Sequence, residues 1–274
     1  MTGFKNFEFV AGLVLIVLIG GAVALSPLLF PDGGRAMDLT ARLTAPFGGW
    51  EHPLGTDPLG RDILARVVVG GRVSFFVGIV SALGAVVIGT VVGLLAGYYR
   101  GPWDMFLMRF ADIQLALPFI LLAMTVIAII GPGLDRIIVL MIVAQWVQYA
   151  RLIRGSVLSL RQAEFVQAAQ SYGLPDRKIL FGHILPNAMG PLVILATLNV
   201  ANNILLESSL TFLGLGIDPL VPSWGGMLAD GRNYIQTAPW VTIFPGLAIM
   251  LTVLGLNLLG DWLRDRLDPL GATK

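Results

Sequence analysis

The sequence predicts an all-α membrane protein, a bundle of six transmembrane helices. Of its 274 residues, 56% are hydrophobic and 13% are charged, which is roughly half the charged share of an average soluble domain. The mean hydropathy is +0.81, and a soluble protein of this length needs more polar residues to cover its surface. Six stretches approach the roughly 20 apolar residues that a membrane helix needs. They are residues 9–30, 73–98, 105–130, 136–151, 188–213 and 240–262.

The first stretch has two interpretations. The small residues Ala22, Val23 and Ala24 suit a signal-peptide cleavage site, whereas the apolar run continues to Phe30 and is longer than a typical signal core. We therefore expect the helix around Leu15 to be retained as an anchor. With the polar loop that follows, it forms a predicted N-terminal unit of residues 1–72, and residues 73–274 form the predicted core domain.

Within the second stretch, Gly89, Gly93 and Gly97 recur every four residues. Small residues at this spacing let membrane helices approach closely, so we assign them to packing rather than to ligand binding. In the third stretch Pro118 is expected to break or bend the helix near a membrane surface. The fourth is the shortest, because Arg136 and Arg151 flank its uncharged part and are expected to reach opposite membrane surfaces.

Polar residues inside membrane spans mark either a transport pathway or a helix contact. In the fifth stretch Asn199, Asn203 and Glu207 share one helix face. They are candidates for lining a translocation pathway, and interhelical hydrogen bonding is the alternative. Arg109 and Asp112 are three residues apart, which predicts an ion pair. Gln145 and Gln148 share a face of the fourth stretch, with no role assigned.

The composition excludes several functions. No cysteine occurs, and the two histidines, His52 and His183, lie far apart, so we expect neither a metal site nor catalytic residues. A phosphate-binding P-loop needs a glycine before its lysine, and none of the three lysines follows one. The net charge of +1 argues against a nucleic-acid partner. We expect a chain that binds no cofactor and is not an enzyme.

The longest charged segment on the predicted cytoplasmic side is the loop 152–187. No helix breaker occurs from Leu160 to Tyr172, while Gly173 suits a helix end and Pro175 the start of a second helix. The first helix carries one predicted apolar stripe. Its members are Leu160, Phe165, Ala168, Ala169 and Tyr172. The stripe fits a helix lying on membrane lipid as well as one docked in the groove of a partner.

In this loop Gln167-Ala168-Ala169 precedes Gly173, and His183-Ile184-Leu185-Pro186 follows. The arrangement resembles the "EAA" loop of ABC-transporter permeases, which forms a coupling helix that enters a cleft of the ATP-hydrolysing subunit. The sequence departs from the general pattern at Gln167, where glutamate is usual, and at His183, where isoleucine is usual. With Glu164-Phe165-Val166 and HILPN at 183–187, it is similar to the peptide-transport branch.

Three further segments resemble C-type subunits of dipeptide, oligopeptide and nickel importers. They are HPLGTDPLGRDILARVVVGGRVS at 52–74, LLESSLTFLGLGIDPLVPSWGGML at 205–228 and NLLGDWLRDRLDP at 257–269. The resemblance implies the type I importer permease fold and transport by alternating access. It also implies a set of residues that couple to the ATPase. These are Glu164, Phe165, Gln167, Ala168, Ala169, Gly173, His183, Leu185 and Pro186.

The resemblance implies partners as well: a homologous second permease, two ABC ATPase subunits that hold ATP and Mg, and an extracytoplasmic solute-binding protein. It places the chain in the bacterial cytoplasmic membrane. Lysine and arginine are modestly enriched in the segments that would face inward if both termini are cytoplasmic.

We expect dipeptides or oligopeptides as cargo. A nickel or metal-chelate permease, or one for glutathione-like solutes, would share these motifs. A secondary transporter without ATPase partners and a non-transporting membrane scaffold are the alternatives from other classes.

Overall fold

The computed structural model describes residues 2–218 and 220–267, with side chains from Phe7 onward, and its regular elements there are helices. Pro219, Asp268 and Pro269, which belong to two of the motifs above, lie outside the described residues. Five helices are long and apolar enough to cross a membrane, and α7 and a π-helical turn extend the fourth at its N-terminal side. They are α1 (Thr2–Leu29), α2 (Ile63–Tyr99), α5 (Leu134–Leu160), α8 (Leu185–Phe212) and α10 (Trp240–Leu267). The predicted all-α membrane fold is confirmed.

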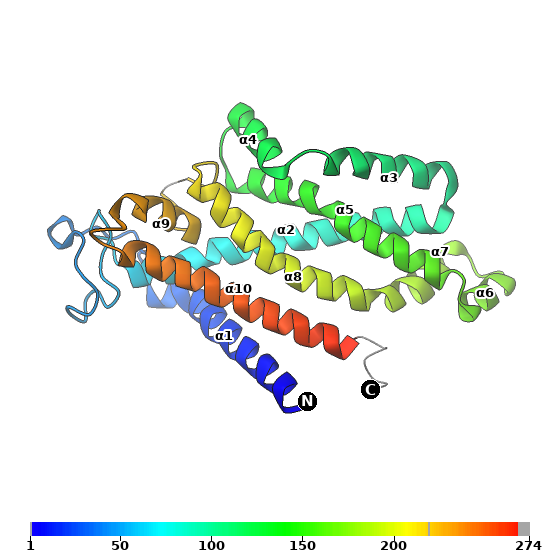
Figure 1. The fold of residues 1–274 in the computed structure, drawn as a ribbon, viewed down its shortest axis with the longest axis horizontal. Coiled ribbons are helices and arrows are strands. Elements are labelled where there is room, and N and C mark those ends of the chain that lie inside the picture. The colour runs from blue at the N-terminus through cyan, green and yellow to red at the C-terminus, as the bar shows by residue number, and fades with distance from the viewer. Residues whose placement is uncertain (1, 219, 268–274) are drawn as a thin grey trace.

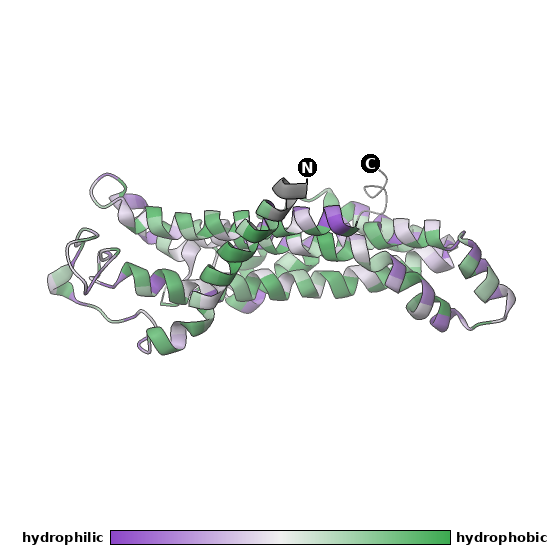
Figure 2. Cartoon of the chain, turned by 90° about the horizontal axis from the view of Figure 1, so that it is seen from below, coloured by the Kyte–Doolittle hydropathy of each residue, from purple (hydrophilic) through white to green (hydrophobic). Residues whose placement is uncertain are grey.

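The long helices lie side by side in an elongated bundle (Figure 1). The segment 30–62 and the short helix α9 (Trp224–Gly231) lie at one end, which we call the loop end. The short helices α6 (Glu164–Ser171) and α7 (Asp176–Ile179) lie at the other, the α6 end. Figure 2 shows hydrophobic residues along the long helices and hydrophilic residues gathered mostly toward the two ends, as expected for a chain that crosses a membrane.

The third predicted span is broken near Pro118, where the sequence predicts a break or bend. It consists of α3 (Gly101–Leu115) and α4 (Phe119–Ile130), and the two are bent by 83° at the break between them. Pro118 explains the break, because its ring disfavours helical geometry at the preceding residue and it lacks an N–H for the helix ladder. The bent pair is the sixth candidate span.

Two helices extend beyond their predicted boundaries. α2 begins at Ile63, where the carboxylate of Asp62 accepts a hydrogen bond from the Ala65 backbone N–H at 2.7 Å. The division between residues 72 and 73 therefore falls inside α2. α5 continues to Leu160 past two arginines, because each meets a carboxylate of α3: Arg154 pairs with Asp104 and Arg151 with Asp112, both at 2.6 Å.

Close packing of α2 on α5 depends on the three glycines that recur every four residues. A methyl group at Gly89 would lie 2.5 Å from the Trp146 carbonyl oxygen, and one at Gly93 would lie 2.5 Å from that of Ala150. At Gly97 it would lie 2.8 Å from Cβ of Val157. Such distances are far inside van der Waals contact, so only glycine lets the two backbones lie this close. The packing role predicted for these glycines is confirmed.

The N-terminal helix α1 packs against α10. The rings of Phe9 and Trp262 lie 4.3 Å apart between centroids, and Gly12 lies directly against the backbone of Gly255. The two helices run in opposite directions. The first residues of α1 and the last residues of α10 both lie away from the loop end (Figure 1). α1 is therefore an integral part of the bundle.

At the loop end an ionic cluster joins segments distant in the sequence. The buried carboxylate of Asp57 accepts hydrogen bonds from Arg66 and, at 2.5 Å, from Nε of Arg61. The same two guanidinium groups donate to Asp230 of α9 at 3.2 and 3.3 Å. Opposite charges in equal number compensate one another's burial, so the cluster holds α9 to the start of α2.

Replacing Gly93 with alanine is expected to force α2 and α5 apart. Overpacking of this kind costs about 1–3 kcal/mol of unfolding free energy, which thermal unfolding of the purified protein in detergent would show as a lower Tm. Gly155→Ala on α5 is the matched control, because a methyl group there meets no atom within 4 Å. Equal destabilisation by both substitutions would contradict the account.

Candidate functional site

The segment with most of the family-like residues folds as two short helices at the α6 end. Glu164 stands in the first turn of α6, where a carboxylate favours the helix dipole. Gly173, at φ +71°, ends the helix as predicted. The N–H of Leu174 donates to the Ala169 carbonyl at 3.2 Å and that of Gly173 to the Gln170 carbonyl at 2.9 Å, the paired bonds of a Schellman cap. The segment thus has a defined shape without any partner.

Two faces of α6 have opposite environments. Val166 and Ala169, three residues apart, are buried against the bundle. Phe165, Ala168 and Tyr172 point away from it and are exposed, Tyr172 at 85% of its surface. We call these three residues the outer apolar face. The predicted single stripe was wrong in placing Ala169 with the outer residues, because Ala169 follows Val166 by three residues and lies on the face buried against the bundle. Leu160 is not part of the outer face either, because it belongs to α5, which ends before α6 begins.

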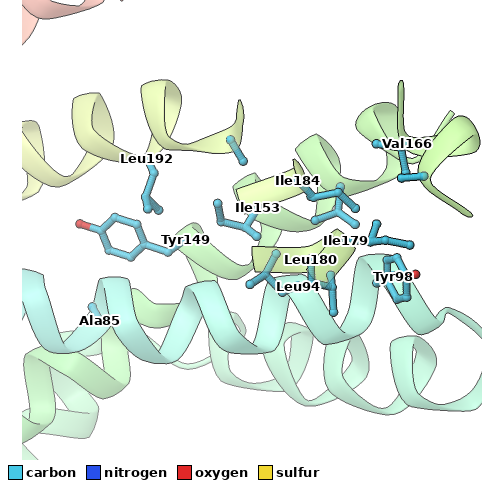
Figure 3. Packing of buried hydrophobic residues seen from close by; sticks show 13 residues of the cluster. Ala85, Leu94, Tyr98, Tyr149, Ile153, Val166, Ile179, Leu180, Ile184 and Leu192 are labelled. Carbon is cyan, nitrogen blue, oxygen red and sulfur yellow. The ribbon is translucent and has the colours of Figure 1, made fainter. Parts of the chain in front are cut away.

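The inner face of α6 belongs to a hydrophobic cluster that joins three long helices (Figure 3). Val166 lies at the α6 side of this cluster, near Ile179 of α7 and Tyr98 of α2. Further members continue along the bundle and include Leu94, Ile153, Val157, Leu180, Ile184 and Leu192. This cluster places the inner face of α6 in one packed group with residues of α2, α5 and α8.

Polar contacts reinforce this packing. The hydroxyl group of Tyr98 donates to Asp176 at 2.6 Å, and Nη1 of Arg161 donates to the Tyr98 carbonyl at 2.6 Å. The Arg161 guanidinium also lies 5.2 Å from the centre of the Tyr98 ring, within the range of a cation–π contact. Tyr98, the penultimate residue of α2, thereby connects the turn before α6 with the start of α7.

A π-helical turn, Leu180–Ile184, joins α7 to α8. Pro186 in the first turn of α8 has no N–H for the usual helical bond, and the N–H of Leu185 reaches back five residues to the Leu180 carbonyl. The carbonyl of His183 accepts a hydrogen bond from the Asn187 side chain at 2.6 Å. His183, Leu185 and Pro186 therefore shape the joint between α7 and α8.

The predicted ion pair of Arg109 with Asp112 is not formed. The carboxylate of Asp112 accepts from Arg151 of α5 instead, at 2.6 Å, with both side chains about half exposed. Spacing along α3 allowed the predicted pair, but it carried no information about α5, which lies beside α3 and supplies the closer cation. The observed pair links α3 to α5.

The polar stripe of α8 divides between two environments. Asn203 is buried, donating to Ser81 at 2.8 Å and to the Gly78 carbonyl at 3.2 Å on α2, and accepting from Gln145 on α5. Glu207 is also buried and accepts from the hydroxyl groups of Ser74 at 3.0 Å and Thr211 at 2.9 Å. These two side chains form contacts within the bundle, which was the alternative to a pathway role.

Asn199, by contrast, lines a cavity of 490 Å³ between α3, α4, α5 and α8. Its amide nitrogen donates to the hydroxyl of Tyr149 at 2.9 Å and to Gln148 at 3.4 Å. Gln114, Gln145, Gln148 and Asn202 line the same cavity. The spacing of Gln145 and Gln148 predicted that they share a face of one helix. It could not predict that this face meets amides of α3 and α8, because no sequence period relates residues on different helices.

Comparison with known proteins identifies relatives along nearly the whole chain. The family model described as "Binding-protein-dependent transport system inner membrane component" matches residues 89–270. The dipeptide transport system permease protein DppC of Alkalihalophilus pseudofirmus is 44% identical over 97% of this chain and 86% of its own. The glutathione transport system permease protein GsiD of Pectobacterium atrosepticum is 44% identical over 97% and 87%. The oligopeptide transport system permease protein OppC of Haemophilus influenzae is 39% identical over 97% and 86%.

A solved structure has the same fold. It is the MetNI methionine ABC transporter in an inward-facing conformation, matched with a TM-score of 0.61 at 21% identity. The match covers 75% of this chain and 97% of the other. The type I importer permease fold predicted from the sequence agrees with this likeness.

Glu207→Ala is expected to destabilise the bundle, because it leaves the hydroxyl groups of Ser74 and Thr211 without their acceptor. The cost is about 1–3 kcal/mol of unfolding free energy, measured by denaturant titration in detergent. Glu207→Gln keeps an acceptor oxygen and is expected to lose less. Ser209→Ala is the control, since that exposed hydroxyl bonds only to the Leu205 carbonyl of its own helix. Wild-type stability of Glu207→Ala would show that these hydrogen bonds contribute nothing.

Proposed function

The chain belongs to the family of binding-protein-dependent transport system inner membrane components, and from this premise we propose that it conducts short peptides into the cell. It is a multi-pass membrane protein and a permease subunit. We propose that it forms the transmembrane pathway together with a homologous second permease. Two ABC ATPases, which hold ATP and Mg, and an extracytoplasmic solute-binding protein complete the proposed transporter.

The observation that carries the proposal is the outer apolar face of α6. An aromatic ring, a small alanine and a second aromatic ring stand exposed on a helix that its cap and its inner face already hold in shape. Amphipathic helices dock by pressing such a face into a hydrophobic groove. We assign this groove to the ATPase. The predicted coupling residues then have two tasks: Phe165 and Ala168 contact the partner, while Ala169, Gly173 and Pro186 hold the helix in position.

Movement would pass from α6 into the bundle through the cluster around Tyr98 and Val166. Closure of the two ATPases on ATP would displace α6, and the packed ends of α2, α5 and α8 would follow as one body. The pathway would thereby alternate between inward-open and outward-open states. In this scheme the loop end faces the extracytoplasmic binding protein, and both termini lie in the cytoplasm.

Short peptides are the cargo best supported by the relatives. Those named for dipeptide and glutathione transport are both 44% identical to the chain, and the one named for oligopeptides is 39% identical. Glutathione is itself a tripeptide, so the three names share one chemical class. Among the described residues, no group of three His, Cys, Asp or Glu side chains lies placed to hold a metal ion.

The proposal is tested by uptake into membrane vesicles that contain the chain with its co-expressed permease, ATPases and binding protein. Labelled dipeptide is expected to accumulate with ATP and to stay outside with a non-hydrolysable analogue. Accumulation driven by an ion gradient without ATP would identify a secondary transporter. ATP-driven uptake of nickel chelates without peptide uptake would refute the proposed cargo.

Ala168→Arg is expected to uncouple the transporter. The charged side chain would have to enter a hydrophobic groove, so peptide-stimulated ATP hydrolysis should fall at least tenfold, which corresponds to about 1.4 kcal/mol. The Tm should stay unchanged because residue 168 is exposed. Gln170→Arg adds the same charge at an exposed position of α6 outside the outer apolar face. Normal coupling in Ala168→Arg, or an equal loss in Gln170→Arg, would contradict the proposed docking.

A further inference from the structure

The cavity beside Asn199 is lined by an unusual set of polar groups. Five carboxamide side chains reach it from three helices, and no charged side chain is among its lining residues. They are Gln114 of α3, Gln145 and Gln148 of α5, and Asn199 and Asn202 of α8. Leucine side chains, Phe119 and Ala144 form the rest of the wall. A few polar groups on an apolar wall, in a volume of 490 Å³, are typical of small-molecule sites.

One of these amides has an unused acceptor. Gln145 is 5% exposed, and its Nε2 donates to Asn203. Its Oε1 is buried and has no hydrogen-bond partner. A buried acceptor without a donor costs about 1–3 kcal/mol, so the hydrogen bonds within the bundle leave this lining amide incompletely satisfied.

Two other amides are exposed within membrane-spanning helices. Gln148 lies near the middle of α5, and Asn202 lies on α8 next to the buried Asn203. A carboxamide that faces hydrocarbon cannot satisfy its donors and acceptors, so polar side chains at this depth face a water-filled space or another protein chain. The cavity side of α5 and α8 is therefore not a lipid-facing surface.

The break in the third span forms part of the same cavity. Leu115, Leu117 and Phe119, which flank the bend between α3 and α4, line it together with Gln114. Gln114 is held in place there, accepting from the Trp146 indole at 2.7 Å and donating to the Val143 carbonyl. One wall is therefore built on a bent helix pair and the other on two long helices.

We propose that the cavity is a binding station for the main chain of a peptide in transit, an inference that rests on the proposed function. A carboxamide has the same donor and acceptor groups as a peptide bond, so the exposed Gln148 and Asn202 can bond to backbone C=O and N–H groups. Because the lining carries no charge, it treats acidic, basic and neutral peptides alike. Uncharged hydrogen bonds also let the cargo leave, which conduction requires.

The chain has no cysteine, so single thiols can be placed without background. Gln148→Cys and Asn202→Cys are treated with a charged, membrane-impermeant methanethiosulfonate reagent in the assembled transporter. Reaction needs a thiolate, which forms in water and not in lipid. Both thiols are expected to react at least roughly tenfold faster than thiols on the opposite face of the same helix. A saturating dipeptide, added with binding protein and ATP, is expected to slow the reaction.

Val139→Cys on α5 and Val193→Cys on α8 are the matched controls. Each lies nine residues from its test position, half a turn away around the helix, and each is exposed. Equal reactivity at test and control positions would overturn the inference. Test thiols that stay unreactive in every state would also overturn it, because they would place this face against the second permease. A fast reaction that dipeptide does not slow would overturn it as well.

A functional experiment separates this inference from the proposed function. In vesicles with active wild-type uptake, Gln148→Leu combined with Asn202→Leu is expected to lower the maximal rate of dipeptide uptake severalfold and to leave the binding protein's affinity unchanged. In a depsipeptide analogue an ester replaces the amide and removes its N–H. The uptake rates of wild type and double variant should therefore differ less for this analogue than for the dipeptide. Wild-type rates in the double variant would refute the binding station alone. Absent ATP-driven uptake in wild type would refute the proposed function.

Discussion

The close approach of α2 and α5 is the constraint on which the rest of the structure depends. Gly89, Gly93 and Gly97 present no side chain to α5, so over these turns the two backbones lie in close contact. This approach brings Tyr98 at the end of α2 beside Val157 near the end of α5. The two helix ends then form the base on which α6 and α7 are seated. A wider separation would leave Val166 and Ile179 without the surface that buries them.

The same contact gives the polar residues of α8 their different roles. Asn203 and Glu207 lie where α8 meets α2, and they satisfy backbone and hydroxyl groups there. Asn199 and Asn202 lie toward α3 and α5, where the bend at Pro118 leaves a cavity. Hydrogen bonds across α2, α5 and α8 fix the bundle on one side, while the amides of Gln148 and Asn202 stand exposed on the other. We infer that stability and transport use adjacent faces of a single helix.

Much of the fold was predictable from local signals. Apolar length located the spans, the four-residue glycine spacing indicated the packing of α2, and Gly173 and Pro175 marked the ends of the short helices. These signals depend on the residue itself or on its own helix. The coupling role of α6 came from resemblance, since the apolar pattern fitted lipid and partner equally well.

The failures share one cause, which is that a neighbouring helix decided the outcome. Arg151 was predicted at the end of a span, but it lies within α5 and pairs with Asp112 of α3. The spacing along α3 had predicted Arg109 as the partner of Asp112. Pro118 indicated a bend near an interface. The size of that bend, 83° between α3 and α4, depends on the neighbours of α4 and could not be predicted from Pro118 alone. Gln148 and Asn202 became candidates only when α5 and α8 stood side by side, because no sequence period connects them.

The central claim is that an ATP-hydrolysing partner drives this permease through the outer apolar face of α6. A photo-activatable crosslinker on Ala168→Cys, in vesicles that accumulate peptide, measures this most directly when the crosslinked products are identified by mass spectrometry. The account predicts an ABC ATPase as the main product, with a yield that changes when ATP is added. Crosslinks to lipid alone, during ATP-driven uptake, would contradict it.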